Sequence, residues 1–374
     1  PPPPPPFVFF MPIPEYEIGV RLVGSEMCIR DRSSRRLFIK KTGLTLASFG
    51  IMPKKIIGAP MIIPNLIKNN SFINGVQLGV ITYSFREMPD QSAEAILEYV
   101  LSSGVNAIEL MGDPAEIYAG RPGKNVDMKK FYQLIYKKEK SDIDRKELKE
   151  LRSQLKDNRE KAQKWRKSAD LNKFEKLGKL FKKAGVDIYA YKPDFLLGSK
   201  NTDDEITFAM KAGKALGASH VTVELPKKDQ SMRLGKLAEK NKIYVGYHGH
   251  TQQTPTWWDE ALKQSPNNAI NIDIGHYTAA GYSTNETIDF FNKKNMHIKS
   301  IHLKDRKNPK NGKENVVWGT GDTPIKEVLL NMKDKKYKFP ATVEYEYKTP
   351  SDSTIIKEVK KCVDYCKNIL ESNV

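Results

Sequence analysis

Two segments decide how this sequence folds: residues 243–250, which read IYVGYHGH, and residues 269–276, which read AINIDIGH. Each is a short run of apolar and β-branched residues, and a helix-sized spacer separates them. This pattern predicts buried parallel strands joined by a helix. Both runs end in side chains that can bind a cation or move a proton. These side chains are His248 and His250 in the first run and Asp273 and His276 in the second.

Two later runs have the same character. Residues 298–305 (IKSIHLKD) end in His302, Lys304 and Asp305, and residues 339–347 (FPATVEYEY) end in Glu344 and Glu346. In a closed (β/α)₈ barrel the C-terminal ends of all strands meet at one face, so side chains from different runs can reach one pocket. The four runs therefore predict a single site built from strand ends.

From residue 76 onward, strand-like and helix-like segments alternate. The expected strands are 76–85, 107–112, 186–193, 220–226, 243–250, 269–276, 298–305 and 339–347. Such units predict an α/β fold, a single (β/α)₈ TIM barrel over residues 76–374, because parallel strands need helical crossovers of one hand. An open doubly wound sheet is the alternative. It needs a Gly-x-Gly-x-x-Gly loop after the first strand, which the sequence lacks there.

The net charge of +17 raises the question of a nucleic-acid partner. Residues 124–183 hold 21 Lys and Arg against 10 Asp and Glu, so much of the excess lies in one helix-forming segment. The aromatic residues of that segment do not alternate regularly with the basic ones, as they do on surfaces that stack bases. We expect a long, solvent-facing helical insertion between the second and third strands, and no nucleic-acid partner.

The N-terminal residues are expected to lie outside the barrel. Residues 1–33 begin with six prolines and resemble translated vector or adapter sequence, and 61–75 is expected to be a linker. Residues 34–60 open with SRRLFIK and resemble the twin-arginine export signal of bacteria. The resemblance implies the twin-arginine export machinery as a partner and a periplasmic or otherwise exported protein. No stretch has the roughly 20 apolar residues that a membrane span needs.

The three cysteines, Cys28, Cys362 and Cys366, have neither a zinc spacing nor a disulfide pattern. We expect them to be ordinary thiols.

The predicted strand ends carry a set of imidazole and carboxylate groups that suits one divalent metal ion. Mn, Zn, Co, Fe and Mg are the candidates, and the mixed ligands suit the first four best, because Mg prefers oxygen ligands. The set is Glu224, His248, His250, Asp273, His276, His302, Glu344 and Glu346. A metal of this kind stabilises the charge that forms when a proton is removed next to a carbonyl, and a carboxylate or imidazole takes the proton. For proton transfer we expect Glu224, His250, Lys192 and Glu346. For substrate contacts we expect Glu109, Trp257, His276 and Lys304, with Trp257 as a sugar-stacking wall.

Asp273-x-x-His276, followed by His302 and Glu344 on later strands, resembles the xylose-isomerase-like sugar phosphate isomerase/epimerase superfamily. The resemblance extends over residues ~76 to 370, the length of one barrel. It implies that Asp273, His302 and Glu344 bind a divalent metal. Many members have a metal-binding Glu where this chain has His248, although a Tyr-His-x-His variant occurs in the inosose-dehydratase-like branch. Either His248 or Glu224 is therefore expected to complete the metal site.

Three functions follow from these residues and this resemblance. The first is a metal-dependent isomerase, epimerase or lyase (dehydratase) acting on a sugar, keto-sugar or cyclitol. The second is a metal-dependent phosphodiesterase resembling apurinic endonucleases, which an export signal disfavours. The third is a non-catalytic sugar-binding barrel, which the complete set of strand-end groups disfavours. The sequence specifies neither the substrate nor the oligomeric state.

Overall fold

The computed structural model describes residues 69–123, 126–193 and 195–372, and the structural findings below concern these residues. Parallel strands lie side by side in sequence order, and the last pairs with the first, which closes the sheet. The strands of the barrel are β2 (Val76–Ile81), β3 (Ala107–Met111), β4 (Asp187–Lys192), β5 (His220–Glu224), β6 (Tyr244–His248), β7 (Asn268–Asp273), β8 (Ile298–Leu303) and β9 (Ala341–Val343). The predicted (β/α)₈ barrel is confirmed, and the open sheet is excluded because β2 and β9 are paired.

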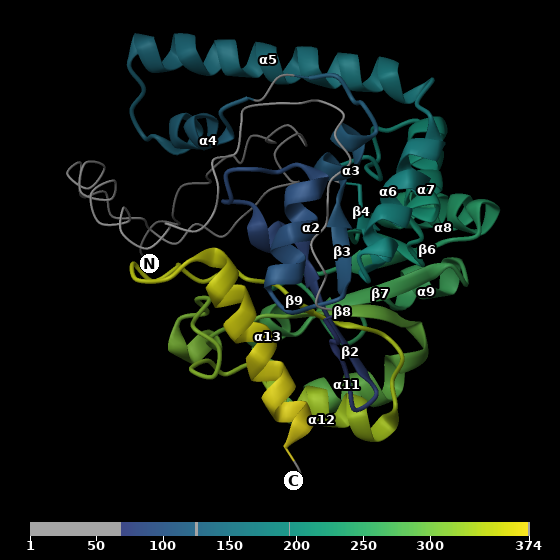
Figure 1. Ribbon diagram of the computed structural model, residues 1–374, viewed down its shortest axis with the longest axis vertical. Coiled ribbons are helices and arrows are strands. Elements are labelled where there is room, and N and C mark those ends of the chain that lie inside the picture. The colour runs from purple at the N-terminus through teal and green to yellow at the C-terminus, as the bar shows by residue number, and fades with distance from the viewer. Residues whose placement is uncertain (1–68, 124–125, 194, 373–374) are drawn as a thin grey trace, which may run out of the picture. The chain divides into compact units, whose positions relative to one another are not determined.

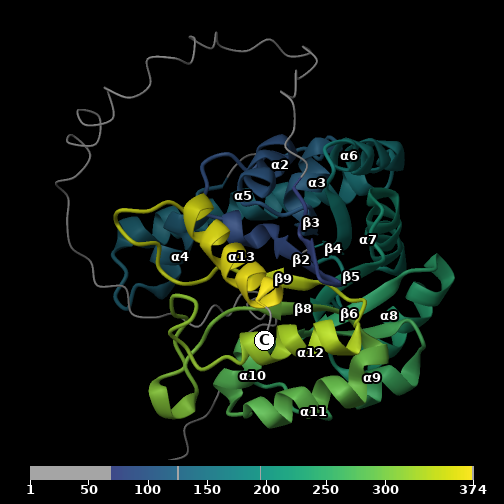
Figure 2. The ribbon, with the colours of Figure 1, turned by 60° about the horizontal axis from the view of Figure 1, so that its bottom comes forward.

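Helices lie between and after the strands, and most of them cover the outside of this barrel, whereas α4 (Met128–Tyr136) and α5 (Asp142–Arg166) extend beyond it (Figures 1 and 2). The other helices are α2 (Ala93–Ser102), α3 (Gly112–Tyr118), α6 (Leu171–Lys183), α7 (Asp203–Leu216), α8 (Lys228–Asn241), α9 (Asp259–Gln264), α10 (Ile274–Ala280), α11 (Thr284–Lys294), α12 (Ile325–Lys335) and α13 (Ile355–Glu371), with 3₁₀ turns η2 (Thr82–Phe85), η3 (Asn295–His297) and η4 (Pro309–Asn311). The local sequence determines where several of these helices begin. Thr202 with Glu205 and Ser283 with Glu286 form capping boxes, which satisfy backbone N–H groups at the starts of α7 and α11.

The strands end earlier than the sequence predicted. β6 ends at His248, β7 at Asp273 and β9 at Val343, so Glu344 stands directly after its strand. The side chains of these residues lie at the C-terminal mouth of the barrel. Strand register brings them together, because His248 pairs with Asn271 and Asp273 pairs with His302 across neighbouring strands.

The expectation that residues 61–75 form a linker is wrong for residues 69–75, the part that the structure describes. Strand β1 (Phe72–Ile73) pairs antiparallel with β2 through a turn at Asn74 and Gly75. Both turn residues have positive φ, 48° and 89°, as a two-residue hairpin turn requires. Ser71 is buried and donates a hydrogen bond to the carbonyl of Leu78 at 2.7 Å. Residues 69–75 therefore belong to the barrel.

The expected helical insertion, residues 124–183, contains three helices. The last, α6, buries Phe174, Leu177 and Phe181 and packs against α7 and β4, as the crossover helix of a barrel unit does. Residues 171–183 therefore belong to the helical layer of the barrel, and the insertion boundary at 183 is corrected. Helices α4 and α5 contact each other and share a small apolar cluster around Leu134, Leu148 and Leu151.

The expectations for residues 1–33, for the export signal 34–60, for residues 61–68 and for Cys28 lie outside the described residues. Cys362 and Cys366 are buried thiols, as predicted. Within the described ranges, no helix combines the length and apolar character needed to cross a membrane.

Candidate active site

Four buried side chains converge at the mouth of the barrel. His248, Asp273, His302 and Glu344 each offer a ligand atom, and these atoms all lie within 4.8 Å of one another. They come from the ends of β6, β7, β8 and β9 respectively. Glu224, the alternative to His248, is not part of this group.

His302 lies between two carboxylates. Its Nδ1 is 2.8 Å from Oε2 of Glu344, and its Nε2 is 2.8 Å from Oε2 of Glu109. Burial lowers the pKa of His302, but the two carboxylates outweigh burial and raise this pKa to about 10. Burial likewise opposes ionisation of Glu109, yet His302 holds the pKa of Glu109 at about 2. The site therefore favours positive charge at the position that His302 occupies.

Glu109 was expected to contact substrate, but it does not face the substrate space. It is completely buried inside the barrel and accepts a hydrogen bond of 2.5 Å from the hydroxyl of Thr222. Its other oxygen faces His302 and the amide of Asn271. Glu109 therefore holds His302 in place, and its substrate role is corrected to an orienting role. Alternation in the strand 107–111 cannot reveal this, because inward-facing residues alternate with outward-facing ones at every depth of a barrel, and the pattern does not separate the interior from the mouth.

Lys304 is buried among the carboxylates and is not at the rim. Its Nζ lies 2.6 Å from Glu346, 3.0 Å from Glu344 and 3.1 Å from Asp273. Burial alone would lower the pKa of Lys304, but these three carboxylates raise it. Lys304 and Glu346 form an ion pair, so each already has a partner within the site.

Asp273 gives a direct test of whether a cation fits. One oxygen, Oδ1, accepts the backbone N–H of His276 at 2.8 Å. The other, Oδ2, is buried and lies 3.1 Å from Lys304 Nζ in an ion pair without hydrogen-bond geometry. Burial raises the pKa of Asp273; the ammonium of Lys304 opposes this rise, and the carboxylate of Glu344 adds to it. A buried carboxylate that lacks full compensation, beside three further ligand groups, fits a divalent cation.

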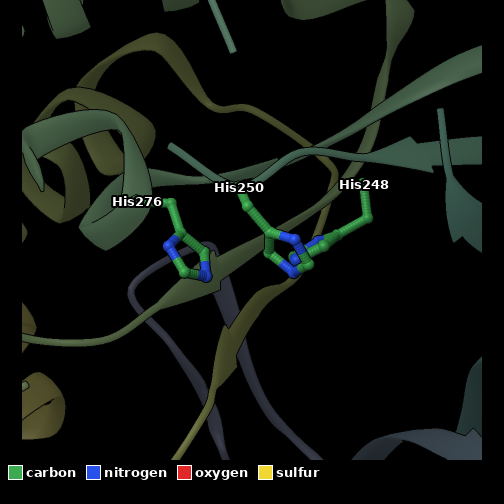
Figure 3. Close-up of side chains that lie close together, drawn as sticks. All are labelled: His248, His250 and His276. Atoms are coloured by element: carbon green, nitrogen blue, oxygen red, sulfur yellow. The ribbon is translucent and has the colours of Figure 1, made fainter. Parts of the chain in front are cut away.

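A second group of histidines lies beside the first. His248, His250 and His276 also have ligand atoms within 4.8 Å of one another, and Figure 3 shows their rings turned toward a common space. The ring centroids of His250 and His276 are 4.7 Å apart, and those of His248 and His250 are 5.1 Å apart. Gly275 places His276 here, because a Cβ at position 275 would lie 2.6 Å from the carbonyl oxygen of Lys304.

Glu224, Lys192 and His250 form the more accessible side of the site. Lys192 Nζ donates to Glu224 Oε1 at 3.2 Å, and His250 Nε2 lies 3.7 Å from Glu224 Oε2. The side chains of Glu224 and His250 are 38% and 41% exposed, although Oε2 of Glu224, the oxygen that faces His250, is itself buried. Burial opposes ionisation of Glu224, but Lys192 and the neighbouring histidines hold its pKa at about 2. Glu224 is thus an ionised carboxylate next to an imidazole.

Trp257 is half-buried and packs over Gly249, where an added Cβ would lie 2.6 Å from the indole Cζ3. The ring therefore lies against the turn between His248 and His250, which is consistent with a wall of the site. Its neighbour Trp258 is fully buried and donates to the carbonyl of Tyr247 at 2.8 Å, so its role is structural.

Several residues near the site were missed by sequence reasoning. Asn271 contacts His248, Arg306 contacts His276, and Gln253 donates to the carbonyl of Asp273 at 2.7 Å. Tyr83 lies two residues after β2; burial raises its pKa to about 12, and Arg86 and Glu346 influence this pKa electrostatically. The strand-end position of Tyr83 was a usable signal, but the amide and guanidinium contacts were not visible in the pattern.

A cavity of about 290 Å³ lies away from these groups. Asp187, Tyr189 and Ser219 contribute to its lining, and they lie at or just before the N-terminal ends of β4 and β5. It therefore occupies the opposite end of the barrel.

Fold and site together define a (β/α)₈ barrel whose strand ends carry a buried imidazole and carboxylate cluster able to hold a divalent metal. Residues 97–366 match the family described as "Xylose isomerase-like TIM barrel". Because this match covers more than half of the chain, the protein belongs to that family. Among curated proteins, no sequence matches this chain.

Solved structures share the fold. The xylose isomerase domain protein of Alicyclobacillus acidocaldarius is 13% identical with a TM-score of 0.54, covering 79% of this chain and 100% of that one. D-psicose 3-epimerase of Clostridium cellulolyticum H10, solved with D-tagatose, is 12% identical with a TM-score of 0.52, covering 79% and 100%. The probable 3-DHS dehydratase of Bacillus anthracis, involved in petrobactin synthesis, is 16% identical with a TM-score of 0.51, covering 77% and 99%. Identities this low show a shared fold only.

Proposed function

We propose that this protein is a metal-dependent isomerase, epimerase or lyase that acts on a sugar, keto-sugar or cyclitol by removing a proton next to a carbonyl. One observation carries the proposal: the ligand atoms of His248, Asp273, His302 and Glu344 lie within 4.8 Å of one another at the mouth of a barrel of this family. Catalytic groups of such barrels gather at that face.

These four residues would hold one divalent ion, with Mn, Zn, Co, Fe and Mg as the candidates. When bound, such an ion acts as a Lewis acid toward the carbonyl oxygen, where negative charge develops as the neighbouring carbon loses its proton. Glu109 accepts Nε2–H of His302, which leaves Nδ1 of His302 as the ligand atom. His248 stands where many members of the family have a glutamate, so the metal site carries less negative charge and one carboxylate fewer for proton transfer.

The proton is taken by the accessible pair of Glu224 and His250. Both side chains are more than one third exposed, and their facing atoms are 3.7 Å apart. Glu224 is ionised and paired with Lys192, so the imidazole of His250 is the better base and Glu224 stabilises it once it is protonated. Lys192 also lies close enough to contact a substrate hydroxyl. Glu346 acts through its ion pair with Lys304, which keeps that ammonium beside Asp273 and Glu344.

The comparisons support this class of reaction without specifying the substrate. D-psicose 3-epimerase, an epimerase of a keto-sugar, and a probable dehydratase have barrels with the same fold. A stacking wall at Trp257 suits the apolar face of a sugar ring. A phosphodiesterase is not favoured by any separate observation at the site.

Carbon-bound hydrogen exchange tests the proposal. The metal-loaded protein is incubated in heavy water with a panel of free sugars, 3-keto-glycosides and cyclitols, and deuterium incorporation is followed by NMR. We expect deuterium at one carbon next to a carbonyl, and loss of that exchange in His250→Gln with metal still bound. No incorporation into any compound, with the protein fully loaded, would argue for a sugar-binding barrel. Cleavage of abasic DNA under the same conditions would favour a phosphodiesterase.

A further inference from the structure

We propose that helix α5 carries a cationic stripe that binds a carboxylate-bearing glycan beside the mouth of the barrel. The stripe consists of five basic residues, each four or three positions after the one before. They are Arg145, Lys149, Arg152, Lys156 and Arg159. The choice of a glycan as partner rests on the proposed function, whereas the cationic stripe itself does not.

The spacing puts the cationic stripe on one side of α5. At 3.6 residues per turn its members fall within an arc of about 80° and extend along about 21 Å of the helix axis. All of them are exposed. The carboxylates of α5 fall outside this arc, and they are Asp142, Asp144, Glu147, Glu150, Asp157 and Glu160. The cationic stripe is therefore a line of one sign of charge, whereas the other exposed side of α5 is mixed.

Nearby carboxylates do not neutralise the cationic stripe. Nε of Arg145 lies 4.0 Å from Oδ1 of Asp142, and Nζ of Lys156 lies 3.8 Å from Oε1 of Glu160. The side chains of Arg145 and Lys156 are 71% and 76% exposed, so water screens both pairs. An anionic partner that lies along the stripe can therefore contact these cations.

The C-terminal end of the cationic stripe lies near the rim of the barrel mouth. The guanidinium of Arg159 stands over the ring of Phe195, 5.7 Å from its centroid. Phe195 comes three residues after Lys192, the last residue of β4 and a member of the accessible side of the site. The end of α5 is fixed there, because Arg166 binds Glu116 of α3. From this end α5 extends past the barrel (Figure 1), so a polymer on the stripe has one end close to the site.

The spacing of the charges separates this partner from a nucleic acid. The stripe presents one cation per about 5 Å of helix axis, whereas duplex DNA carries one phosphate per about 1.7 Å of its axis. Single strands are bound by aromatic side chains that stack on bases. The one aromatic residue of α5, Trp165, packs edge-on against Phe208 of α7. A glycan with one carboxylate per sugar or fewer has sparser charge, and sugars are the proposed substrates of this barrel.

A membrane surface does not fit the cationic stripe. Helices that lie on membranes insert apolar side chains while their basic residues contact the lipid headgroups. Ile143 is the exposed apolar residue of α5, at 78%, but it lies about 160° around the helix from Arg145. A membrane that contacts the stripe therefore cannot also bury Ile143.

The order of residue types in the cationic stripe suits carboxylates. Arginines at positions 145, 152 and 159 alternate with lysines at 149 and 156. A guanidinium binds a carboxylate through two parallel hydrogen bonds, whereas an ammonium acts as a point charge. The stripe therefore offers bidentate sites at regular intervals to a linear chain of carboxylates.

Polygalacturonate, a polymer of uronic acids, is the probe for this proposal. Its affinity for the full chain, metal-free and at low salt, is measured by biolayer interferometry. Two triple variants each remove three positive charges from α5. They are Lys149→Gln/Arg152→Gln/Lys156→Gln in the cationic stripe and Lys146→Gln/Lys161→Gln/Lys164→Gln, the matched control on the mixed side. Gln is a good helix former, so both variants should keep the helix content of the wild type, which circular dichroism checks.

We expect the stripe variant to bind polygalacturonate about 10-fold more weakly than the wild type, because each exposed ion pair contributes roughly twofold or more. Its affinity should also depend less steeply on salt. The control variant should bind within about twofold of the wild type. Equal losses in the two variants would show an effect of net charge alone and would overturn the proposal. Absence of binding to the wild type at low salt would overturn it as well.

Two other polyanions test the choice of partner. Stripe-dependent binding of oligo(dT) or of phosphatidylglycerol vesicles that is tighter than that of polygalacturonate would overturn the proposal in favour of a nucleic acid or a membrane. All these measurements use metal-free protein, so absence of sugar deuteration leaves them unchanged. A failure of the proposed function is therefore distinguishable from a failure of the cationic stripe.

Discussion

The carboxylate of Glu109 accepts a hydrogen bond from Nε2 of His302 at 2.8 Å, across 193 residues of sequence. A carboxylate behind a ligating histidine fixes the orientation of the ring and makes it a better metal ligand. Glu109 is fully buried, so this contact acts on His302 and not on solutes.

Replacing Glu109 with Gln should lower the affinity for Mn²⁺ or Zn²⁺ by about 10–100-fold, because the charge behind His302 is lost while an acceptor remains. Titration with a competing chelator measures this change. Glu98→Gln, on an exposed position of α2, is the matched control and should bind like the wild type. Equal affinity of both variants would mean that Glu109 has only a packing role.

The burial of His220 should make the protein less stable in acid. It is fully buried between Ser219 and Ser300, and burial lowers its pKa to about 4. Between the unfolded pKa of about 6.5 and this value, the unfolded chain binds a proton that the folded chain excludes. Stability should therefore fall as pH falls through this window, by up to about 1.4 kcal/mol per pH unit.

Urea unfolding of the metal-free protein at pH 7 and pH 5 measures the contribution of His220. The variant His220→Gln should be less stable at pH 7 but lose less stability between the two pH values. His297→Gln, which removes an exposed histidine, should retain the wild-type difference. If the free energy of unfolding falls by the same amount between pH 7 and pH 5 in all three proteins, His220 is not the cause of the loss of stability in acid.

Arg166 anchors the pair of helices α4 and α5 to the barrel. Its Nε and Nη2 each lie 2.7 Å from an oxygen of Glu116 on α3, and both side chains are buried. Arg166→Met should leave the charge of Glu116 only partly compensated by Arg121, which should lower the free energy of unfolding by roughly 3–5 kcal/mol.

Limited proteolysis of the Arg166→Met variant should then cut residues 137–141 faster than in the wild type and leave the rest of the chain compact. The exposed Arg152→Met is the control, and cooperative unfolding of the whole chain on cleavage would show that these helices are part of the core.

Export is a separate proposal that rests on the sequence SRRLFIK at 34–40. Replacing Arg35 and Arg36 together with Lys should trap the precursor in the cytoplasm, because receptors that read a guanidinium pair do not accept ammonium groups as equivalent. Immunoblots of periplasmic and cytoplasmic fractions measure the distribution. Unchanged periplasmic recovery would rule out this signal.

Much of the fold could be predicted because each barrel strand is a buried run and the spacers have the length of helices. His248, Asp273, His302 and Glu344 could be placed at strand ends for the same reason, and one face of the barrel brings them together. Segment boundaries were less predictable. Helix α6 has the same Lys-rich composition as α5, and only its contacts with α7 and β4 separate it from the helices outside the barrel.

The orienting contacts could not be predicted, since they depend on side-chain geometry inside the barrel. Asn271 lies in a predicted strand segment and Arg306 directly follows another, but neither carries a pattern that assigns it to a particular histidine. Glu109 and Lys304 were expected to contact substrate because charged strand-end residues usually face a mouth. In the structure, both are buried against other members of the site.

The number of metal ions bound per chain shows whether His248, Asp273, His302 and Glu344 form a metal centre. Equilibrium dialysis with Mn²⁺ and Zn²⁺, followed by elemental analysis, gives the number of ions per chain for the wild type, Asp273→Asn and His302→Gln, with the surface variant Asp364→Asn as control. We predict one ion per chain in the wild type and the control. Both ligand variants should lose more than about 100-fold in affinity, since even residues that only orient a ligand cost 10–100-fold. Full occupancy in both Asp273→Asn and His302→Gln would contradict a metal centre at this site.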